Sequence, residues 1–265
     1  MVDQDCIFCG NILGGNRAKE HVVPRWLLQC LGVEKEIVIP AVARTEDWEI
    51  VDRRRHTADA LLEGHVCKTC NNGWMASLEG AAKPILVPLI DGKRSIFGFS
   101  NDERLVLARW AAKTAYALNS SSSLDDKVSP SHLRELQASA KSLPPGVAVF
   151  IQQHGLEDKH TRHFSWIQRN DWRYLSLVPP GDDEHRMGDG GYKVGLQFGR
   201  LILLVVYWPH PGRRFVVGAG MHVALWPWEA RSFAYTINET VPMTDSYLWL
   251  AAFNQMLGVA QMEEI

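Results

Sequence analysis

Apolar residues recur every three or four positions between residues 101 and 119, and this spacing predicts a helix with one apolar face. The recurring positions are Leu105, Ala108, Ala112 and Ala115. Ser100 or Asn101 can cap the first turn, and Glu103 lies within that turn. The serine run from Ser120 to Ser123 marks the end of the helix.

Three further helices follow from the same kind of pattern. One begins near Asn72 and should stop near Pro84. A short one is expected from Ser129 to Leu143, because Pro130 suits a first-turn position where its missing N–H donor costs nothing. The last helix is predicted from Tyr247 to Met262, again with apolar residues on one face.

Between residues 147 and 228 the pattern changes to runs rich in β-branched and aromatic residues, separated by Gly, Pro and Asp turns. These runs are Val147 to Ile151, Trp172 to Val178, Tyr192 to Trp208 and Met221 to Trp226. They predict a mainly antiparallel sheet, and together with the helices they indicate a fold of the α+β class.

The cysteines divide the chain of 265 residues into two parts. Two Cys-x-x-Cys pairs lie within the first seventy residues, and no cysteine follows them. We therefore expect a first domain over residues 1–100, with a long insertion at 25–66, and an α+β accessory domain over residues 101–265. The accessory domain carries no catalytic motif, which leaves substrate selection, homodimer formation and regulation open as its role.

A membrane role is not expected. The longest apolar run, Leu201 to Trp208, has the length of a strand and is far too short to cross a bilayer. Residues 1–5 include two acidic residues and lack the basic start of a secretory signal, so we expect a cytoplasmic protein without disulfides.

Overall charge does not favour nucleic-acid binding, since the formal net charge is -2. Any such contact must be local. Arg53, Arg54 and Arg55 form the densest basic run and lie between the cysteine pairs, where they could meet a phosphate backbone. Lys68 is a further candidate for a phosphate contact. The alternative is an ordinary solvated run of charge.

The cysteine pairs are the strongest chemical signal in the sequence. They consist of Cys6, Cys9, Cys67 and Cys70. Two residues between cysteines let both sulfurs of a tight turn face one ion, and two such turns supply four thiolates for tetrahedral zinc. A zinc ion with four protein ligands has no open position, so it would be structural. Cys30 lies in an apolar helical stretch and is expected to pack in the core.

The residues around these cysteines resemble a known family. Glu20, His21 and Pro24 frame an acid-His-aliphatic-aliphatic-Pro motif between the pairs, and Asn71 directly follows the last cysteine. This arrangement resembles the zinc-containing HNH (His-Me finger) endonucleases, including the endonuclease VII group, over residues 5 to 79. The resemblance implies a ββα-metal fold, in which zinc joins a β-hairpin that carries the Glu-His pair to a helix that carries the Asn.

Carried over to this chain, the resemblance makes His21 the general base and makes Glu20 and Asn71 the ligands of a catalytic Mg²⁺ or Mn²⁺. A neutral imidazole can take a proton from water at physiological pH, and carboxylate and amide oxygens suit a hard ion. The chain departs from the family in having Glu where Asp is frequent. It also has no Asn from Arg17 to Cys70, so His56 or His65 would have to support the base.

These observations predict a metal-dependent endonuclease that hydrolyses phosphodiester bonds, with DNA as its expected partner. The alternative is a catalytically inactive zinc-ribbon module that binds nucleic acid or a protein partner. The endonuclease should bind a second divalent ion through Glu20, and the inactive module should not.

Overall fold

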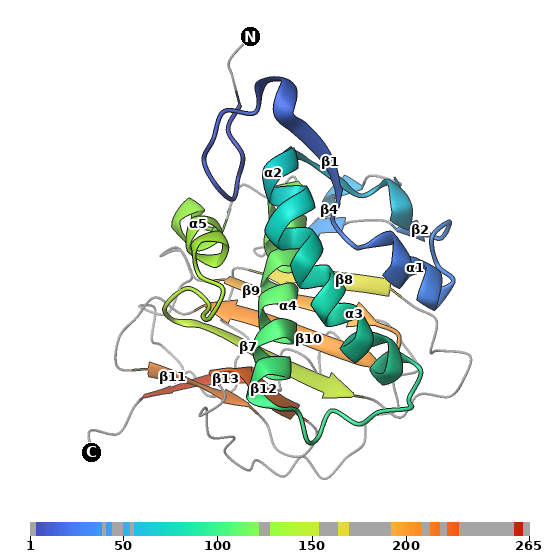
Figure 1. The fold of residues 1–265 in the computed structure, drawn as a ribbon. Coiled ribbons are helices and arrows are strands. Elements are labelled where there is room, and N and C mark those ends of the chain that lie inside the picture. The colour runs from blue at the N-terminus through green and yellow to red at the C-terminus, as the bar shows by residue number, and fades with distance from the viewer. Residues whose placement is uncertain are drawn as a thin grey trace.

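A five-stranded antiparallel sheet and two long helices organise the computed structural model of this chain (Figure 1). The structure describes the backbone of residues 4–38, 41–43, 50–53, 56–121, 128–153, 164–169, 192–207, 213–217, 222–227 and 257–261. The predicted α+β class with antiparallel sheets is confirmed. Within the described residues, no helix combines the length and the apolar character that crossing a bilayer requires.

The N-terminal part is built on a two-stranded antiparallel hairpin. Strand β1 (Arg17–His21) follows a 3-10 turn, η1 (Gly14–Asn16), and pairs with β6 (Leu62–Cys67). The segment between these strands forms α1 and short elements. These are α1 (Arg25–Leu31), β2 (Ile37–Val38), β3 (Ala41–Ala43), β4 (Ile50–Arg53), β5 (His56–Thr57) and η2 (Ala58–Ala60). Strand β2 pairs with β5, and β3 pairs with β4.

Helical structure begins directly after the hairpin. The turn α2 (Lys68–Cys70) leads through a π-helical turn, η3 (Asn71–Met75), into α3 (Ala76–Ile90). The prediction that this helix stops near Pro84 is wrong, because α3 contains both Pro84 and Pro88.

The continuation of α3 past Pro84 has a physical explanation in its buried residues. A proline inside a helix costs roughly 3 kcal/mol. The apolar side chains beyond it are buried, and each contributes about 1.5–3 kcal/mol. They are Ile85, Leu86, Leu89 and Ile90. Their burial outweighs the local penalty, which sequence reasoning did not include.

The central element is α4 (Asn101–Ser121), which matches the helix predicted for residues 101–119. Ser100 caps it: the Ser100 Oγ accepts from the Glu103 N–H at 3.2 Å, and the Glu103 carboxylate accepts from the Ser100 N–H at 3.0 Å. The helix is buried on all sides from Leu107 to Asn119 rather than on one face, because it lies between α3 and the sheet. Figure 1 shows α3 and α4 side by side, with α4 crossing the strands.

The sheet lies behind α4 with the strand order β12-β7-β10-β9-β8, and every pairing in it is antiparallel. Its strands are β7 (Val147–Gln153), β8 (Phe164–Arg169), β9 (Tyr192–Phe198), β10 (Leu201–Tyr207) and β12 (His222–Trp226). Phe198 packs against Trp110 of α4 with ring centroids 5.5 Å apart. Gly199, at φ +56°, opens the turn between β9 and β10 in the left-handed region that favours glycine.

Two other predicted helices differ from the structure. Helix α5 (Pro130–Ala138) begins at the expected proline but ends five residues before Leu143. The helix predicted over residues 247–262 is wrong where the chain is described, because β13 (Leu257–Gln261) is a strand paired with β11 (Arg213–Val217). Gly258 and Val259 are weak helix formers, and a distant strand supplies the hydrogen bonds instead. The predicted strand Trp172 to Val178 lies outside the described residues.

One hydrophobic core runs through both parts of the chain. It extends without interruption from Phe8 near the N-terminus, through α3 and α4, to the β7, β9 and β10 strands. The boundary expected near residue 100 therefore coincides with a loop but not with a gap in the core. The division into domains over residues 1–100 and 101–265 stays a prediction.

Candidate metal centre and adjoining hairpin

Four cysteines gather at the end of the hairpin. The sulfur atoms of Cys6, Cys9, Cys67 and Cys70 all lie within 4.8 Å of one another. A tetrahedral zinc ion with Zn–S bonds near 2.3 Å requires sulfurs about 3.8 Å apart. The Cys9 and Cys67 sulfurs are 3.7 Å apart, so this set fits one such ion. In the described part of the chain, no other group of three or more His, Cys, Asp or Glu residues converges in this way.

The first cysteine turn owes its shape to Gly10. This residue adopts φ +73°, which a side chain disfavours, and its N–H donates to the Cys6 carbonyl at 2.8 Å. The Ile7 N–H donates to the His65 carbonyl of β6 at 2.9 Å. The turn is thus closed locally by glycine and fastened to the hairpin by one backbone hydrogen bond.

The second cysteine pair spans the end of β6 and the turn α2. Its backbone N–H groups point at sulfurs of the cluster: the Cys70 N–H donates to the Cys67 Sγ at 3.3 Å, and the Cys67 N–H donates to the Cys6 Sγ of the first pair at 3.4 Å. Burial raises the pKa of the Cys67 thiol, but hydrogen bonds, led by the Cys70 N–H, outweigh burial and give a net lowering. Burial raises the pKa of the Cys70 thiol. The backbone therefore favours negative charge on Cys67.

Aromatic side chains pack around the cysteine cluster. Phe8 is fully buried and meets the edge of Trp74 at a centroid distance of 5.3 Å. Burial dominates the raised pKa of the Cys70 thiol, and the nearby Trp74 indole N–H offsets only part of that rise. Trp74 is partly buried and packs against the core. Three of the four cysteines are buried and Cys9 is partly buried, so the cluster could bind one zinc ion at the edge of the core.

Side chains alternate along β1. Arg17 and Lys19 are exposed, Ala18 and Glu20 are buried, and His21 is half-buried. In the hairpin register Glu20 lies opposite Glu63, and a β-bulge interrupts the pairing between Ala18 and Glu20. Consecutive residues of a strand point to opposite faces. The Glu20 carboxylate therefore lies beneath the hairpin, whereas His21 lies on the more open side.

Glu20 forms an ion pair that the sequence did not predict. Its Oε1 accepts from the Lys113 Nζ of α4 at 2.8 Å, and the same nitrogen donates to the Glu79 Oε1 of α3 at 2.7 Å. Lys113 has no exposed surface. Burial lowers the pKa of Lys113, but the charges of Glu20 and Glu79 outweigh this effect and give a net rise. The ammonium thus stays charged between two carboxylates.

Asn71 begins the π-helical turn that directly follows Cys70. Its Nδ2 donates to the Asn72 Oδ1 at 3.0 Å, an interaction that does not engage its own amide oxygen. The turn contains a kink at Gly73, whose φ of -94° and ψ of -109° are not helical. Asn71 therefore lies at the junction of the cysteine cluster and the following helical segment.

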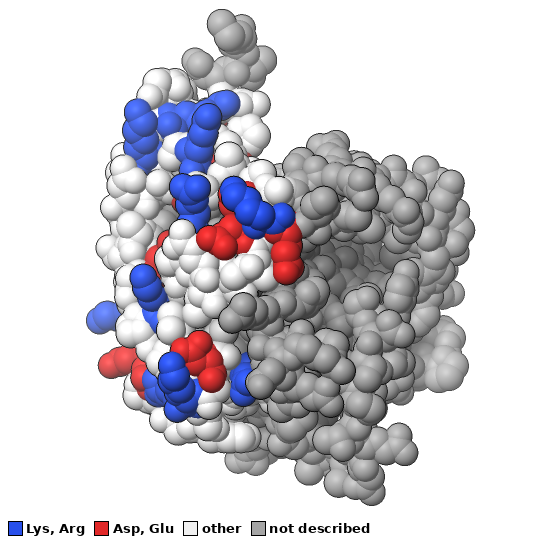
Figure 2. Space-filling model, turned by 90° about the vertical axis from the view of Figure 1, so that its right-hand side faces the viewer, with Lys and Arg blue, Asp and Glu red and all other residues white. Residues whose placement is uncertain are grey.

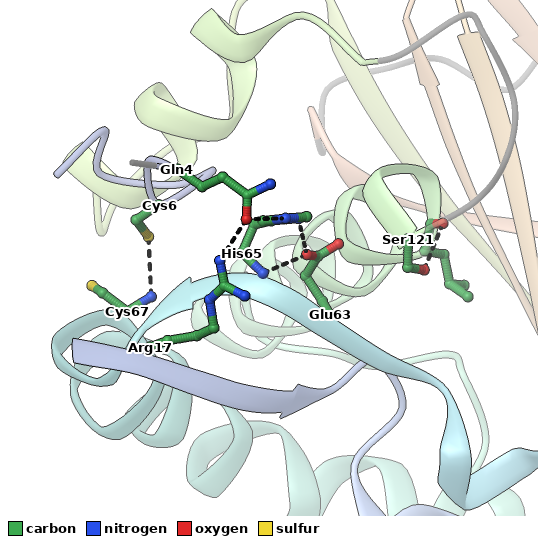
Figure 3. A network of polar contacts seen from close by, with 8 residues as sticks. Gln4, Cys6, Arg17, Glu63, His65, Cys67 and Ser121 are labelled. Atoms are coloured by element: carbon green, nitrogen blue, oxygen red, sulfur yellow. Dashed lines mark hydrogen bonds and ion pairs between the residues drawn. The ribbon is translucent and has the colours of Figure 1, made fainter. Parts of the chain in front are cut away.

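A second polar network lies on the other strand of the hairpin (Figure 3). Gln4 bridges Arg17 and His65, with its Oε1 3.0 Å from the His65 Nε2. The Glu63 Oε1 lies 3.1 Å from the His65 Nδ1 and accepts the His65 backbone N–H at 2.7 Å. His65 is therefore not among the residues of the cysteine cluster. Glu63 is buried to 1% exposure, and its Oε2 has no hydrogen-bond partner within the described residues.

The basic residues singled out in the sequence are only partly described. Arg53 ends β4, and Arg54 and Arg55 lie outside the described residues. Lys68 is exposed, with its Nζ 3.4 Å from the Gly15 carbonyl. Figure 2 shows Lys and Arg side chains gathered at the top of the molecule, above a region where both signs of charge are mixed. Exposed Arg17 lies opposite Cys67 in the hairpin register, next to Lys68.

Sequence reasoning missed Lys113, Glu79 and Glu63. One signal for Lys113 was present, because it interrupts the apolar run from Ala111 to Ala117, where an unpaired charge would be costly. The sequence could not identify its partners, which come from elements 34 and 93 residues away.

Comparison with known proteins adds no relative to this description: no family model, no curated protein and no solved structure matches the chain.

Proposed function

We propose that this protein is a metal-dependent endonuclease of the HNH type, which hydrolyses phosphodiester bonds in DNA. The observation that supports the proposal is an antiparallel hairpin followed directly by a helical segment, with four clustered cysteines at their junction. That hairpin carries Glu20 and His21, and the helical segment begins with Asn71. In this proposal, zinc bound by the cysteines keeps the hairpin and the helix in register.

In the proposed reaction, His21 takes the proton from the attacking water. A neutral imidazole suits this role at physiological pH, and the half-buried position of His21 leaves it accessible to a substrate. Glu20 and Asn71 supply oxygen ligands for Mg²⁺ or Mn²⁺. Such an ion, when bound, would neutralise charge that develops on the phosphate and the leaving 3′ oxygen. The products would carry 5′-phosphate and 3′-hydroxyl ends.

The donor set of Glu20 and Asn71 fits a hard divalent ion in its chemistry, since carboxylate and amide oxygens are the ligands such ions prefer. The Lys113 ammonium engages one Glu20 oxygen, which leaves the other for an ion. The amide oxygen of Asn71 is not used in its hydrogen bond to Asn72. Both residues therefore retain a donor atom for the proposed role.

A cleavage assay tests the proposal. Purified protein is incubated with supercoiled plasmid or with single-stranded DNA, in the presence of Mg²⁺ or Mn²⁺. We expect cleavage by the wild type and a loss of about 100- to 10,000-fold in the His21→Ala variant, the range for removal of a general base. His21→Ala should retain its zinc content and its fold. Equal survival of both DNA substrates with wild type and variant would refute the proposal.

A second candidate function is a zinc-bound module that binds nucleic acid without cutting it. The ion pair between Glu20 and Lys113 favours this alternative, because it gives the carboxylate a role other than metal binding. The module predicts one zinc ion per chain and no further divalent ion. Calorimetric titration with Mn²⁺ separates the two functions: a binding event lost in Glu20→Gln supports the nuclease, and its absence supports the module.

A further inference from the structure

Lys113 connects the second half of the chain to the proposed nuclease centre. It lies in the middle of α4, which also packs against the five-stranded sheet. Its Nζ reaches the hairpin at Glu20 and the helix α3 at Glu79, with distances of 2.8 and 2.7 Å. No other described residue forms a side-chain ion pair or hydrogen bond between α4 and β1.

The burial of this group makes its geometry well defined. The Lys113 side chain has no exposed surface, the Glu20 side chain is 10% exposed and the Glu79 side chain 22%. A buried ammonium without partners is strongly disfavoured, so Lys113 must keep its hydrogen bonds to both carboxylates. The Glu20 carboxylate is therefore held in one orientation, with Oε1 directed at α4.

The second carboxylate explains how Glu20 can remain available to a cation. Lys113 carries one positive charge, and Glu79 offsets it from the other side at a nearly equal distance. The three groups together carry a net charge of about -1. Without Glu79, the pair of Glu20 and Lys113 would be neutral and would attract a divalent ion weakly.

We propose that Lys113 is a positioning residue, which orients the Glu20 carboxylate for the divalent ion while Glu79 cancels the charge of its ammonium. The inference rests on the function proposed above. It assigns α4 a direct part in shaping the centre, so the second half of the chain is more than an appended domain. Hydrogen-bonding partners of ligating carboxylates typically change metal affinity about 10- to 100-fold when removed.

Mn²⁺ binding, followed by electron paramagnetic resonance on the zinc-loaded full chain, tests this inference without relying on cleavage. The Lys113→Met variant lacks the positive charge that lies between Glu20 and Glu79. The charge of this site therefore becomes more negative, and charge alone predicts tighter Mn²⁺ binding. Positioning predicts the opposite, a loss of about 10- to 100-fold. The double variant Lys113→Met/Glu79→Gln keeps the net charge of the wild type and leaves no unpaired second carboxylate. We expect its Mn²⁺ affinity to fall by at least about tenfold as well.

The double variant also serves if Lys113→Met fails to fold, because it keeps the net charge of the wild-type group. Arg109→Met is the matched control. Arg109 is a buried cation one turn earlier on α4, and it donates to the carbonyls of Leu136 and Ser142 rather than to Glu20. This variant should lose stability in urea unfolding and keep the Mn²⁺ affinity of the wild type.

The outcomes separate the inference from the proposed function. If Glu20→Gln abolishes Mn²⁺ binding while the double variant binds as the wild type does, Lys113 is structural and the inference is wrong, although the proposed function stands. If Glu20→Gln leaves Mn²⁺ binding unchanged, both are wrong. An equal loss in Arg109→Met and the double variant would also overturn the inference, because it would show a general effect of destabilising α4.

Discussion

Removal of the zinc ion proposed for the cysteine cluster should release the N-terminal segment before any other part of the fold. Residues 4–16 contain the first cysteine turn and pack few apolar side chains deeply, chiefly Phe8 and Leu13. Fixing the backbone of these 13 residues costs about 13 kcal/mol at the lower end of the usual range. Burial of the two side chains returns about 3–6 kcal/mol. Burial of these side chains therefore does not offset the entropy cost of ordering the segment, and other interactions must supply the difference.

Backbone hydrogen bonds reduce this deficit only in part. Amides of the segment donate five bonds to carbonyls, at 2.7–2.9 Å, which contribute roughly 5 kcal/mol together. A shortfall of at least about 2–5 kcal/mol remains. Structural zinc sites contribute about 10–16 kcal/mol in small peptides, which is more than enough to order the segment. We therefore expect residues 4–16 to unfold locally when zinc is chelated, while the sheet stays intact.

Hydrogen exchange with and without a chelator measures this directly. The amides of Cys6, Ile7 and Gly10 should lose protection in the metal-free protein, whereas amides of β10 should keep theirs. Cys70→Ser should reproduce the effect and lower the zinc content below one per chain. Cys30→Ser is the matched control, because Cys30 lies in α1 outside the cluster. Unchanged protection of the Ile7 amide in zinc-free protein would refute the reasoning.

Three further predictions concern stability and binding. A bidentate pairing with Arg94 lowers the pKa of Glu103 to about 2. The Glu103 carboxylate therefore stabilises the fold fully above its ordinary pKa, and this contribution is lost as the pH falls toward 2. Urea unfolding from pH 2 to 7 should show this dependence in the wild type but not in Glu103→Gln. Trp110→Ala removes a fully buried ring that packs on Phe198 and should lower the free energy of unfolding by about 3–5 kcal/mol, as measured by urea titration. If Lys68 contacts a phosphate, Lys68→Ala should reduce by about one unit the slope of the logarithm of the DNA-binding constant against the logarithm of the salt concentration. An unchanged slope would show that Lys68 does not contact the DNA backbone.

The sequence by itself determined the local features of this protein. The spacing of Cys6, Cys9, Cys67 and Cys70 predicted their convergence, because a two-residue separation lets both sulfurs of one turn face the same point. Helix α4 and its serine cap were predicted because periodicity and capping depend on neighbouring residues. The antiparallel class of the sheet followed from β-rich runs and turn residues, although β8 was not predicted and the run from Tyr192 to Trp208 forms two strands, β9 and β10.

Tertiary structure alone decided the features that depend on distant partners. Helix α3 continues through Pro84 because burial further along outweighs a local penalty, and Leu257–Gln261 is a strand because β11 supplies its hydrogen bonds. The sequence showed Glu20 beside a histidine but gave no indication that Lys113 would meet it. Such pairings depend on how helices and strands pack in space, since long-range contacts are set by the whole core and leave little trace in the residues nearby.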